Sequence, residues 1–400
     1  MPVEDEPIVR IAARGEGVTA SGRHVTLAAP GDLLRADGTL IAGEHHQTPP
    51  CRHFPECGGC QLQHLDDTAY TGFLADRVAG ALRSQGLAGD VRTPILSPPR
   101  TRRRATLHAE RRGGQIVLGF AQAASHQLID IQECWILAPP LFAILAPLRR
   151  LLAAQLAGSG RIDVHLALVD QGIDMVLRGR LREGLAASEA ITRFAEKHSL
   201  ARLSVDDGYG AQPRWEPDPV TITLGGVAVP MPPSSFLQAT REGEAALVDS
   251  VRAIVGDLPT VADLFAGLGT FALSLPPGTR VYAAEGAREA ILSLKAGAGG
   301  AQRQVFAEHR DLFRRPLIPA ELDRFAAVIL DPPRAGAREQ AAQLAASTVG
   351  RVAYVSCNPS SFARDAKTMC EAGYRLEWVQ PVGQFRWSTH VELVACLSRG

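Results

Sequence analysis

The chain has 400 residues, of which 46% are apolar and 21% are charged, and its 42 basic and 42 acidic side chains give a formal net charge of zero. This length predicts two or three domains, and the composition is that of an ordinary globular protein. Zero net charge argues against a protein whose whole surface binds nucleic acid. It does not exclude a local basic patch. The acidic start and the lack of a long apolar run predict no signal peptide, no membrane partner and a cytoplasmic location in which thiols stay reduced.

The first part of the chain, residues 7–44, reads as short strands separated by glycine turns, which predicts a small β module. A turn-rich loop follows, and its cysteines join a more distant one in a set of four soft ligands: Cys51, Cys57, Cys60 and Cys134. Such a set holds tetrahedral zinc or a cubane iron–sulfur cluster, and the spacing alone does not select the metal. A zinc site that uses His53 or His64 in place of Cys134 is the nearest alternative.

The rest of the chain divides into a region of mixed helices and strands and a region in which helices and strands alternate. Apolar periodicity predicts a helix over residues 70–84 and another around 141–156, with strands beginning near residue 101 and over 163–169. From about residue 236 onward, helices and strands alternate to the end. This alternation predicts a mostly parallel sheet that is covered by helices on both faces.

Three chemically distinctive motifs stand at the ends of predicted strands in this last region. One strand runs into the turn Gly267-Leu268-Gly269, a second ends in Asp331-Pro332-Pro333, and a third ends in Cys357. Because parallel strands end at the same edge of a sheet, we expect these groups to lie near one another. The two prolines fix the backbone after Asp331, so that its carboxylate is held in place.

The glycine turn fits the G-x-G-x-x-A form of a nucleotide-binding turn, and Glu285 ends the next strand as a ribose-binding acid would. The motif alone is a weak signal, because a tight strand-to-helix turn without a ligand has the same pattern. The choice between NAD and S-adenosylmethionine depends on the rest of the domain. An acid followed by two prolines at a strand tip is typical of methyltransferases that act on planar bases, which favours S-adenosylmethionine.

A dense cationic cluster lies near the start of the central strands, and it comprises Arg100, Arg102, Arg103, Arg104, Arg111 and Arg112. A lone run of charge is most often a solvated hairpin. In a chain that is otherwise electrically balanced, one concentrated positive patch is a reasonable site for phosphates. Guanidinium groups also stack on unpaired bases, so we expect Arg102, Arg103 and Arg104 to contact single-stranded RNA.

These residues together resemble the RNA uracil-5-methyltransferase family, specifically its branch with a [4Fe-4S] cluster, which modifies ribosomal and transfer RNA. Six motifs in order carry the resemblance: Cys51-x5-Cys57-Gly58-Gly59-Cys60, Ser234-Ser235-Phe236-Leu237-Gln238, Asp263-Leu264-Phe265-x-Gly267-x-Gly269, Leu330-Asp331-Pro332-Pro333-Arg334, Val355-Ser356-Cys357-Asn358-Pro359 and Thr389-His390-Val391-Glu392. Thr240 and Thr270 stand where the family usually has asparagine, and the amino-terminal module looks like a shortened TRAM domain.

The resemblance implies an α/β fold with three parts. These are a truncated TRAM-like β module over residues 1–46, a central α+β domain with the iron–sulfur cluster and the basic strand over 47–235, and a Rossmann-like class I methyltransferase domain over 236–400. It implies S-adenosylmethionine and a [4Fe-4S] cluster as cofactors, and RNA as the partner of a monomer.

The resemblance also implies roles for particular residues. Cys357 matches the nucleophile and Glu392 the base that removes the proton from C5, while Cys51, Cys57, Cys60 and Cys134 match the cluster ligands. The residues that match the cofactor site are Gln238, Phe265, Gly267, Gly269, Thr270, Glu285, Asp311 and Asp331.

The expected reaction is methyl transfer to C5 of a uridine in RNA. C5 of uracil is a poor nucleophile, and addition of a thiolate at C6 turns the ring into an enolate that can attack the methyl group. Ribosomal RNA is the favoured substrate, and transfer RNA is the alternative. A non-catalytic RNA-binding homologue and a NAD-linked oxidoreductase are the competing functions, and the second leaves the Asp331-Pro332-Pro333 turn unexplained.

Overall fold

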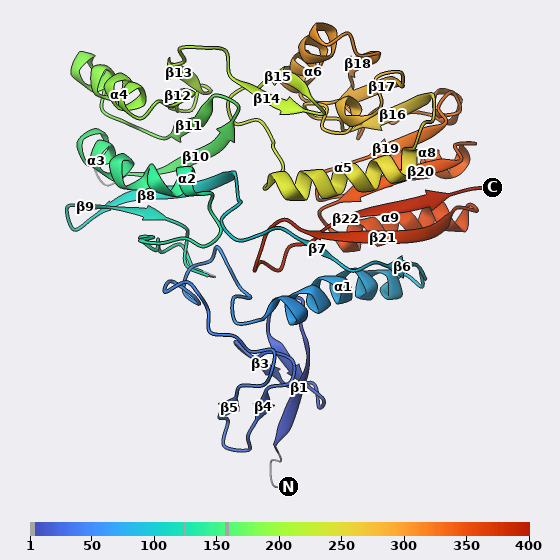
Figure 1. Cartoon of the computed structure of the whole chain (residues 1–400), viewed down its shortest axis with the longest axis horizontal. Helices are drawn as coiled ribbons and strands as arrows, with labels where there is room; N and C mark the ends of the chain where they lie inside the picture. Colours follow the sequence, from blue (N-terminus) through green and yellow to red (C-terminus); the bar gives the residue numbers. More distant parts are fainter. Residues whose placement is uncertain (1–4, 124, 157–159) are drawn as a thin grey trace.

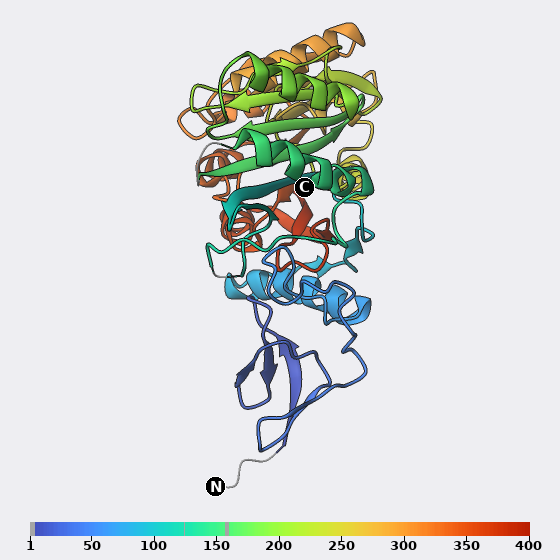
Figure 2. The same ribbon diagram turned by 90° about the vertical axis from the view of Figure 1, so that its left-hand side faces the viewer.

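The computed structural model describes residues 5–123, 125–156 and 160–400. A small β module at the amino terminus projects from one end of the molecule, and two larger units, each built on a sheet, make up the rest (Figure 1). The view turned by 90° shows the same projection below helix α1 (Figure 2). None of the helices in these described ranges is both long and apolar enough to cross a membrane.

The amino-terminal module is a five-stranded sheet in the order β3-β2-β1-β4-β5. Its strands are β1 (Glu6–Ile11), β2 (Gly17–Thr19), β3 (His24–Val25), β4 (Leu33–Leu34) and β5 (Leu40–Ile41). The fully buried Asp32 accepts hydrogen bonds from the backbone amides of Ala29 and Gly43, at 2.7 Å each, and contacts the His46 ring. These bonds hold the loop between β3 and β4 against the segment that follows β5. The predicted small β module is present.

The central unit is a six-stranded sheet in the order β13-β12-β11-β10-β8-β9. Its strands are β8 (Arg104–Arg112), β9 (Gln115–Gly119), β10 (Arg161–Val169), β11 (Gly172–Arg178), β12 (Arg202–Asp206) and β13 (Gln212–Trp215), and a hairpin of β14 (Thr221–Leu224) and β15 (Val227–Pro230) follows. The helices of this unit are α2 (Pro139–Ala143), α3 (Leu145–Gln155) and α4 (Leu185–Lys197).

The helix predicted around 141–156 is interrupted at Ile144, between α2 and α3. Pro147 explains the break, because it has no amide hydrogen to donate to the carbonyl of Ala143 four residues earlier. The apolar face of α3, with Leu145, Leu148 and Leu152, is buried in the same core as the alternating apolar residues of β8.

The carboxyl-terminal unit is a nine-stranded sheet in the order β18-β17-β16-β19-β20-β22-β21-β6, with β7 also paired to β21. Its strands are β6 (Asp90–Val91), β7 (Ile95–Leu96), β16 (Thr260–Leu264), β17 (Arg280–Glu285), β18 (Val305–His309), β19 (Ala327–Leu330), β20 (Arg351–Ser356), β21 (Arg375–Gly383) and β22 (Glu392–Ser398). The central strands β16 to β20 are parallel, and β22 runs antiparallel to both of its neighbours. The predicted parallel sheet is therefore confirmed in its central strands.

Helices pack on this sheet as the alternating pattern predicts. They are α5 (Arg241–Val255), α6 (Arg288–Gly300), α7 (Pro319–Leu322), α8 (Arg338–Ala346) and α9 (Pro359–Glu371), and the glycine turn leads into a short 3₁₀ helix, η1 (Ala272–Ser274). The chain order of the strands reverses between β16 and β19, and ligands of open α/β sheets bind at such a switch point, beyond the carboxyl ends of the strands.

Helix α1 (Asp67–Ser84) belongs to the carboxyl-terminal unit, although its sequence position places it within the central range 47–235. Asp66 caps its first turn, and Tyr70, Phe73 and Leu74 are buried in the same core as α8 and α9. The Tyr70 hydroxyl also donates to the backbone carbonyls of Phe385 and Ser388, both at 3.1 Å. Because β6 and β7 pair with β21 as well, the structure groups residues 67–96 with the carboxyl-terminal sheet.

Arg103 links the central unit to the carboxyl-terminal unit. Its side chain is 4% exposed, and it donates to the Glu244 carboxylate of α5 at 2.6 Å and to the Gln238 carbonyl at 3.0 Å. The backbone amide of Arg103 donates to the Ala239 carbonyl at 2.8 Å. This buried ion pair fixes β8 against the start of α5.

We expect Arg103→Ala to lower the free energy of unfolding by about 3–5 kcal/mol, because it leaves the Glu244 carboxylate buried without its partner. Urea unfolding followed by fluorescence measures the change. The double variant Arg103→Met with Glu244→Leu removes both charges and is expected to recover most of the loss. Equal stability of the wild type and Arg103→Ala would contradict a role for the ion pair.

Candidate active site

A cleft of about 840 Å³ lies between the central unit and the carboxyl-terminal sheet. One side is formed by the loops that follow the parallel strands, including Phe265, Glu285, Asp331 and Cys357. The other side is formed by the thiol-rich loop around Gly58 and by residues near the start of β8. The cleft therefore stands where the switch point predicts a ligand site.

The turn after β16 is tightly folded. Phe265, Gly267 and Gly269 have φ angles of 64°, 55° and 95°, in the left-handed region that favours glycine. A Cβ atom on Gly269 would lie 2.4 Å from a methyl carbon of Leu294. The Glu285 carboxylate accepts a hydrogen bond from the Gly267 amide at 3.0 Å, which joins the turn to the end of β17.

Most of the predicted cofactor residues meet in this cleft. Those that line it are Gln238, Phe265, Gly267, Thr270, Glu285, Asp311 and Asp331. Gly269 is not part of the lining, because it packs against Leu294 within the turn. The Asp311 carboxylate accepts from the amides of Phe313 and Arg314, and the Phe313 ring lies 5.3 Å from the ring of Phe265.

Thr240, which departs from the usual family residue, has a structural role in addition to lining the cleft. Its hydroxyl accepts the amide hydrogen of Gly243 at 2.9 Å and so caps α5. The same oxygen lies 2.7 Å from the hydroxyl of Ser97. A threonine is well suited to this position, because it is a favourable helix cap.

Cys357 and Glu392 are brought together by the antiparallel pairing of β20 and β22. Ser356 pairs with Leu393, so the residue after β20 and the residue before Leu393 are neighbours at the edge of the sheet. Both side chains line the cleft, as does Asp331 at the end of β19. Asn358 caps α9 and donates to the Arg334 carbonyl at 3.0 Å, which holds the loop after Cys357 against the Asp331 turn.

Burial and neighbouring negative charges raise the pKa values of Cys357 and Asp331, and burial raises that of Glu392. Burial, with the nearby Glu392 and Asp331 carboxylates, raises the pKa of the Cys357 thiol to about 11. Burial raises the pKa of Glu392 to about 7, against the opposing effect of Gln384 and Arg104. The pKa of Asp331 is also raised well above its usual value, by burial and then by Glu392 and other carboxylates.

Sequence reasoning missed two buried residues that support this site. Asp263 is fully buried, its carboxylate accepts from the Ala272 amide at 2.9 Å, and burial raises its pKa to about 7. Gln384, after β21, donates to the Gln238 side-chain oxygen at 2.8 Å and accepts from the Ala239 amide at 2.9 Å. Asp263 belonged to a recognised motif, whereas no pattern in the sequence distinguishes Gln384.

Of the three predicted RNA-binding arginines, two line the cleft and one does not. Arg102 and Arg104 line the cleft, and their guanidinium groups lie 5.4 Å from the ring centroid of Phe385 and 4.5 Å from that of Phe236, respectively. The Phe236 ring is 62% exposed. Arg103 does not reach the cleft, because successive side chains of an extended chain point to opposite sides and its partner Glu244 lies on the other side.

The four predicted metal-binding cysteines line one small cavity next to the cleft, together with His53 and Trp135. Burial raises the pKa of all four thiols. Gly58 and Gly59, which stand between two of these cysteines, line the main cleft. Within the described parts of the chain, no three His, Cys, Asp or Glu side chains are arranged to hold a single metal ion.

Known proteins resemble this chain in sequence. Residues 299–400 match the model of the tRNA (uracil-5-)-methyltransferase family. An uncharacterized RNA methyltransferase of Zymomonas mobilis is 52% identical over 98% of this chain and 99% of its own length. The 23S rRNA (uracil(1939)-C(5))-methyltransferase RlmD of Halomonas elongata is 32% identical over 92% of this chain and 80% of its own length.

A solved structure has the same fold across the whole molecule. The tRNA (uracil-54, C5)-methyltransferase of Pyrococcus abyssi, in complex with S-adenosyl-L-homocysteine, superimposes with a TM-score of 0.75. The two proteins are 22% identical, and the match covers 98% of this chain and 99% of the other. Together with the long and closely similar relatives, the fold and the cleft show that this chain belongs to the family of S-adenosylmethionine-dependent RNA uracil-5-methyltransferases.

Proposed function

We propose that this protein methylates C5 of a specific uridine in 23S ribosomal RNA through a transient bond between Cys357 and C6 of the uracil ring. The observation that carries the proposal is the position of Cys357 and Glu392 side by side in the cleft that also contains the glycine turn. A nucleophile and a base are then available at the same edge of the sheet as a nucleoside-binding turn.

The Cys357 thiol is the proposed nucleophile. As a thiolate it adds to C6, which breaks the C5–C6 double bond and places negative charge on C5 and its neighbouring carbonyl. C5 then forms a bond to the methyl group that bound S-adenosylmethionine would supply, while the sulfur–methyl bond breaks and S-adenosylhomocysteine leaves as the thioether. Loss of the C5 proton then restores the double bond, and the sulfur leaves as the thiolate.

Glu392 is the proposed base for the C5 proton. A pKa of about 7 is close to the best value for a general base that works near neutral pH. The same carboxylate is one of the charges that oppose formation of the Cys357 thiolate. A positively charged ligand in the cleft reduces this opposition, since it offsets the charges of Glu392 and Asp331.

The lining of the cleft supports the proposed cofactor residues. Glu285, at the tip of β17, offers a carboxylate for ribose hydroxyls, and Asp311, which follows β18 and also lines the cleft, is the proposed contact for the adenine. Phe265 and Thr270 flank the glycine turn, and Gln238 reaches the cleft from the segment before α5. The acidic character of the site suits a sulfonium cofactor.

The favoured RNA substrate follows from the relatives. The Halomonas elongata relative, 32% identical over most of both chains, is a 23S rRNA enzyme, and the Pyrococcus abyssi protein, which acts on tRNA, shares the fold at lower identity. Transfer RNA is therefore the alternative substrate. Arg102, Arg104 and the exposed Phe236 ring give the cleft cationic and aromatic surfaces that suit an unstacked RNA segment.

We propose a [4Fe-4S] cluster on Cys51, Cys57, Cys60 and Cys134. In a cubane each iron takes one cysteine, so the four ligands surround a volume rather than a point. The four thiols line one cavity, which fits this requirement, and a fourth cysteine makes a histidine ligand unnecessary. The proposed position of the cluster is directly behind the Gly58–Gly59 wall of the cleft.

We propose four further assignments. The amino-terminal module, residues 1–46, is a shortened TRAM-like domain, and the central region carries the cluster ahead of the methyltransferase unit. The protein acts as a monomer, and it is located in the cytoplasm, where its RNA substrate is found.

We expect Cys357→Ala to abolish both methyl transfer and the covalent trapping of 5-fluorouridine RNA, because no sulfur is left to add to C6. Glu392→Gln is expected to form the adduct with ordinary RNA and to release it slowly, since the C5 proton then has no base. Denaturing gels with labelled RNA and labelled S-adenosylmethionine measure both effects. Cys370→Ser, on α9, serves as the matched control; turnover by Cys357→Ala would remove Cys357 from its role.

We expect the protein purified without oxygen to be brown and to contain about four iron and four sulfide per chain. Cys57→Ser is expected to lose colour and iron, whereas Cys370→Ser keeps both, because Cys370 lies outside the thiol cavity. Metal analysis and the visible spectrum are the measurements. A colourless wild-type protein with stoichiometric zinc would contradict the cluster.

A further inference from the structure

A second hollow, of about 630 Å³, lies at the opposite ends of the strands from the active-site cleft. It lies over the beginnings of β16, β17 and β18, where Thr260, Arg280 and Gln304 contribute to its lining. The cleft, in contrast, lies beyond the carboxyl ends of these strands. We call this hollow the arginine groove, because Arg280, Arg303 and Arg324 line it.

The groove has an aromatic floor on one face of the sheet. Tyr282 of β17 pairs with Phe306 of β18, and their rings are stacked with centroids 6.0 Å apart and planes at 19°. The Phe325 ring packs on the other side of Tyr282, at 5.6 Å. Since β18 is the edge strand, the Phe306 ring is 68% exposed, so a flat apolar surface faces outward.

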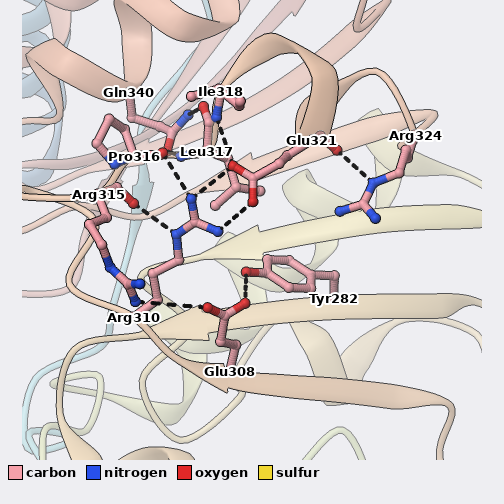
Figure 3. A network of polar contacts seen from close by, with 10 residues as sticks. All are labelled: Tyr282, Glu308, Arg310, Arg315, Pro316, Leu317, Ile318, Glu321, Arg324 and Gln340. Atoms are coloured by element: carbon pink, nitrogen blue, oxygen red, sulfur yellow. Dashed lines mark hydrogen bonds and ion pairs between the residues drawn. The ribbon is translucent and has the colours of Figure 1, made fainter.

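The two carboxylates beside this floor, those of Glu308 and Glu321, already have hydrogen-bonding partners within the protein. The Tyr282 hydroxyl donates to Glu308 at 2.6 Å, and Arg310 makes a bidentate pair with Glu321 at 2.7 and 2.8 Å (Figure 3). Glu308 also lies 4.0 Å from Arg315. Burial and the bond to Glu308 raise the pKa of Tyr282 to about 12, so its ring is neutral.

The arginines of the groove have no carboxylate partner within the described residues. Arg280 is exposed, and Arg324 donates only to the backbone carbonyl of Glu321, at 3.2 Å. Arg303 donates to the carbonyls of Leu273 and Leu275. None of the residues that line the groove is acidic, so three guanidinium groups surround an exposed aromatic surface.

This combination identifies the occupant by its chemistry. Proteins that bind single-stranded nucleic acid combine aromatic rings that stack on bases with cations that contact the phosphates. An apolar peptide would leave the positive charges of the three guanidinium groups without a negative partner. A second copy of this chain in the groove would bring the same cations face to face, which opposes association.

We propose that the arginine groove binds a single-stranded segment of the RNA substrate at a distance from the target uridine. Bases stack on Phe306 and Tyr282, and phosphates contact Arg280 and Arg324. The six residues of β17 span roughly 20 Å, so only an RNA that extends well past the target nucleotide reaches both sites. The inference rests on the proposed function for the identity of the RNA.

The test compares Phe306→Ala, and the double variant Arg280→Ala with Arg324→Ala, to the wild-type protein. Phe306 and Arg280 are exposed, and Arg324 makes one hydrogen bond to a backbone carbonyl, so we expect both variants to fold. We expect Phe306→Ala to weaken binding of fluorescein-labelled oligouridine about tenfold, as loss of one stacking ring does. The double variant is expected to reduce the salt slope of binding by about one unit for each arginine.

Matched controls are available on the central unit. Tyr209 is 93% exposed, and Arg193 lies on the surface of α4, so Tyr209→Ala and Arg193→Ala test for the loss of any exposed ring or cation. We expect both controls to bind oligouridine as the wild type does. In methylation assays, the groove variants are expected to raise the KM for long ribosomal RNA and to leave kcat, and the methylation of a short target stem-loop, unchanged.

The outcomes separate this proposal from the proposed function. Unchanged affinity and salt dependence in both groove variants would overturn the groove as an RNA site. A change in the oligomeric state of Phe306→Ala, with unchanged RNA binding, would instead assign the surface to a second copy of the chain. Groove-dependent RNA binding by a wild-type protein that methylates no RNA would overturn the proposed function and leave the groove assignment standing.

Discussion

The antiparallel pairing of β20 with β22 is the constraint on which the candidate active site depends. Parallel strands deliver their carboxyl ends to one edge of the sheet, and this brings Asp331 and Cys357 together. A strand that runs the other way delivers its beginning to the same edge, and Glu392 is the first residue of β22. One reversed strand therefore places a carboxylate beside a thiol that lies far from it in the sequence.

The central unit completes the site from the other side. The Arg103–Glu244 ion pair holds the start of β8 against α5, and this keeps Arg102 and Arg104 over the cleft. Gln384 connects the same region to the sheet through its bonds to Gln238 and Ala239. The thiol-rich loop contributes Gly58 and Gly59 to the wall, so the proposed metal site behind this loop and the cleft share one segment of the chain.

Much of this arrangement could be predicted from the sequence, because strand ends and tight turns leave local signals. The glycine turn, Asp331 and Cys357 each follow an apolar strand, and they meet as the parallel sheet requires. Glu392 begins a strand, so only the family resemblance distinguished it. The sequence predicts the same RNA-binding role for Arg103 as for Arg102 and Arg104, because a run of arginines does not show which side chain points away from the cleft. Helix α1 joined the carboxyl-terminal sheet through tertiary contacts with α9 that local pattern cannot reveal.

The central claim is that burial, together with the carboxylates of Glu392 and Asp331, keeps the Cys357 thiol protonated until a positive charge enters the cleft. The most direct measurement is the pH dependence of Cys357 alkylation by iodoacetamide, followed by mass spectrometry of the peptide that contains Cys357. The measurement is made on the free protein, with S-adenosylmethionine, and with S-adenosylhomocysteine, whose sulfur is uncharged. The account predicts an inflection near pH 11 in the free protein, which the sulfonium compound lowers more than the thioether does. An inflection at the ordinary thiol pKa of about 8.5 without any ligand, or equal shifts with both compounds, would contradict it.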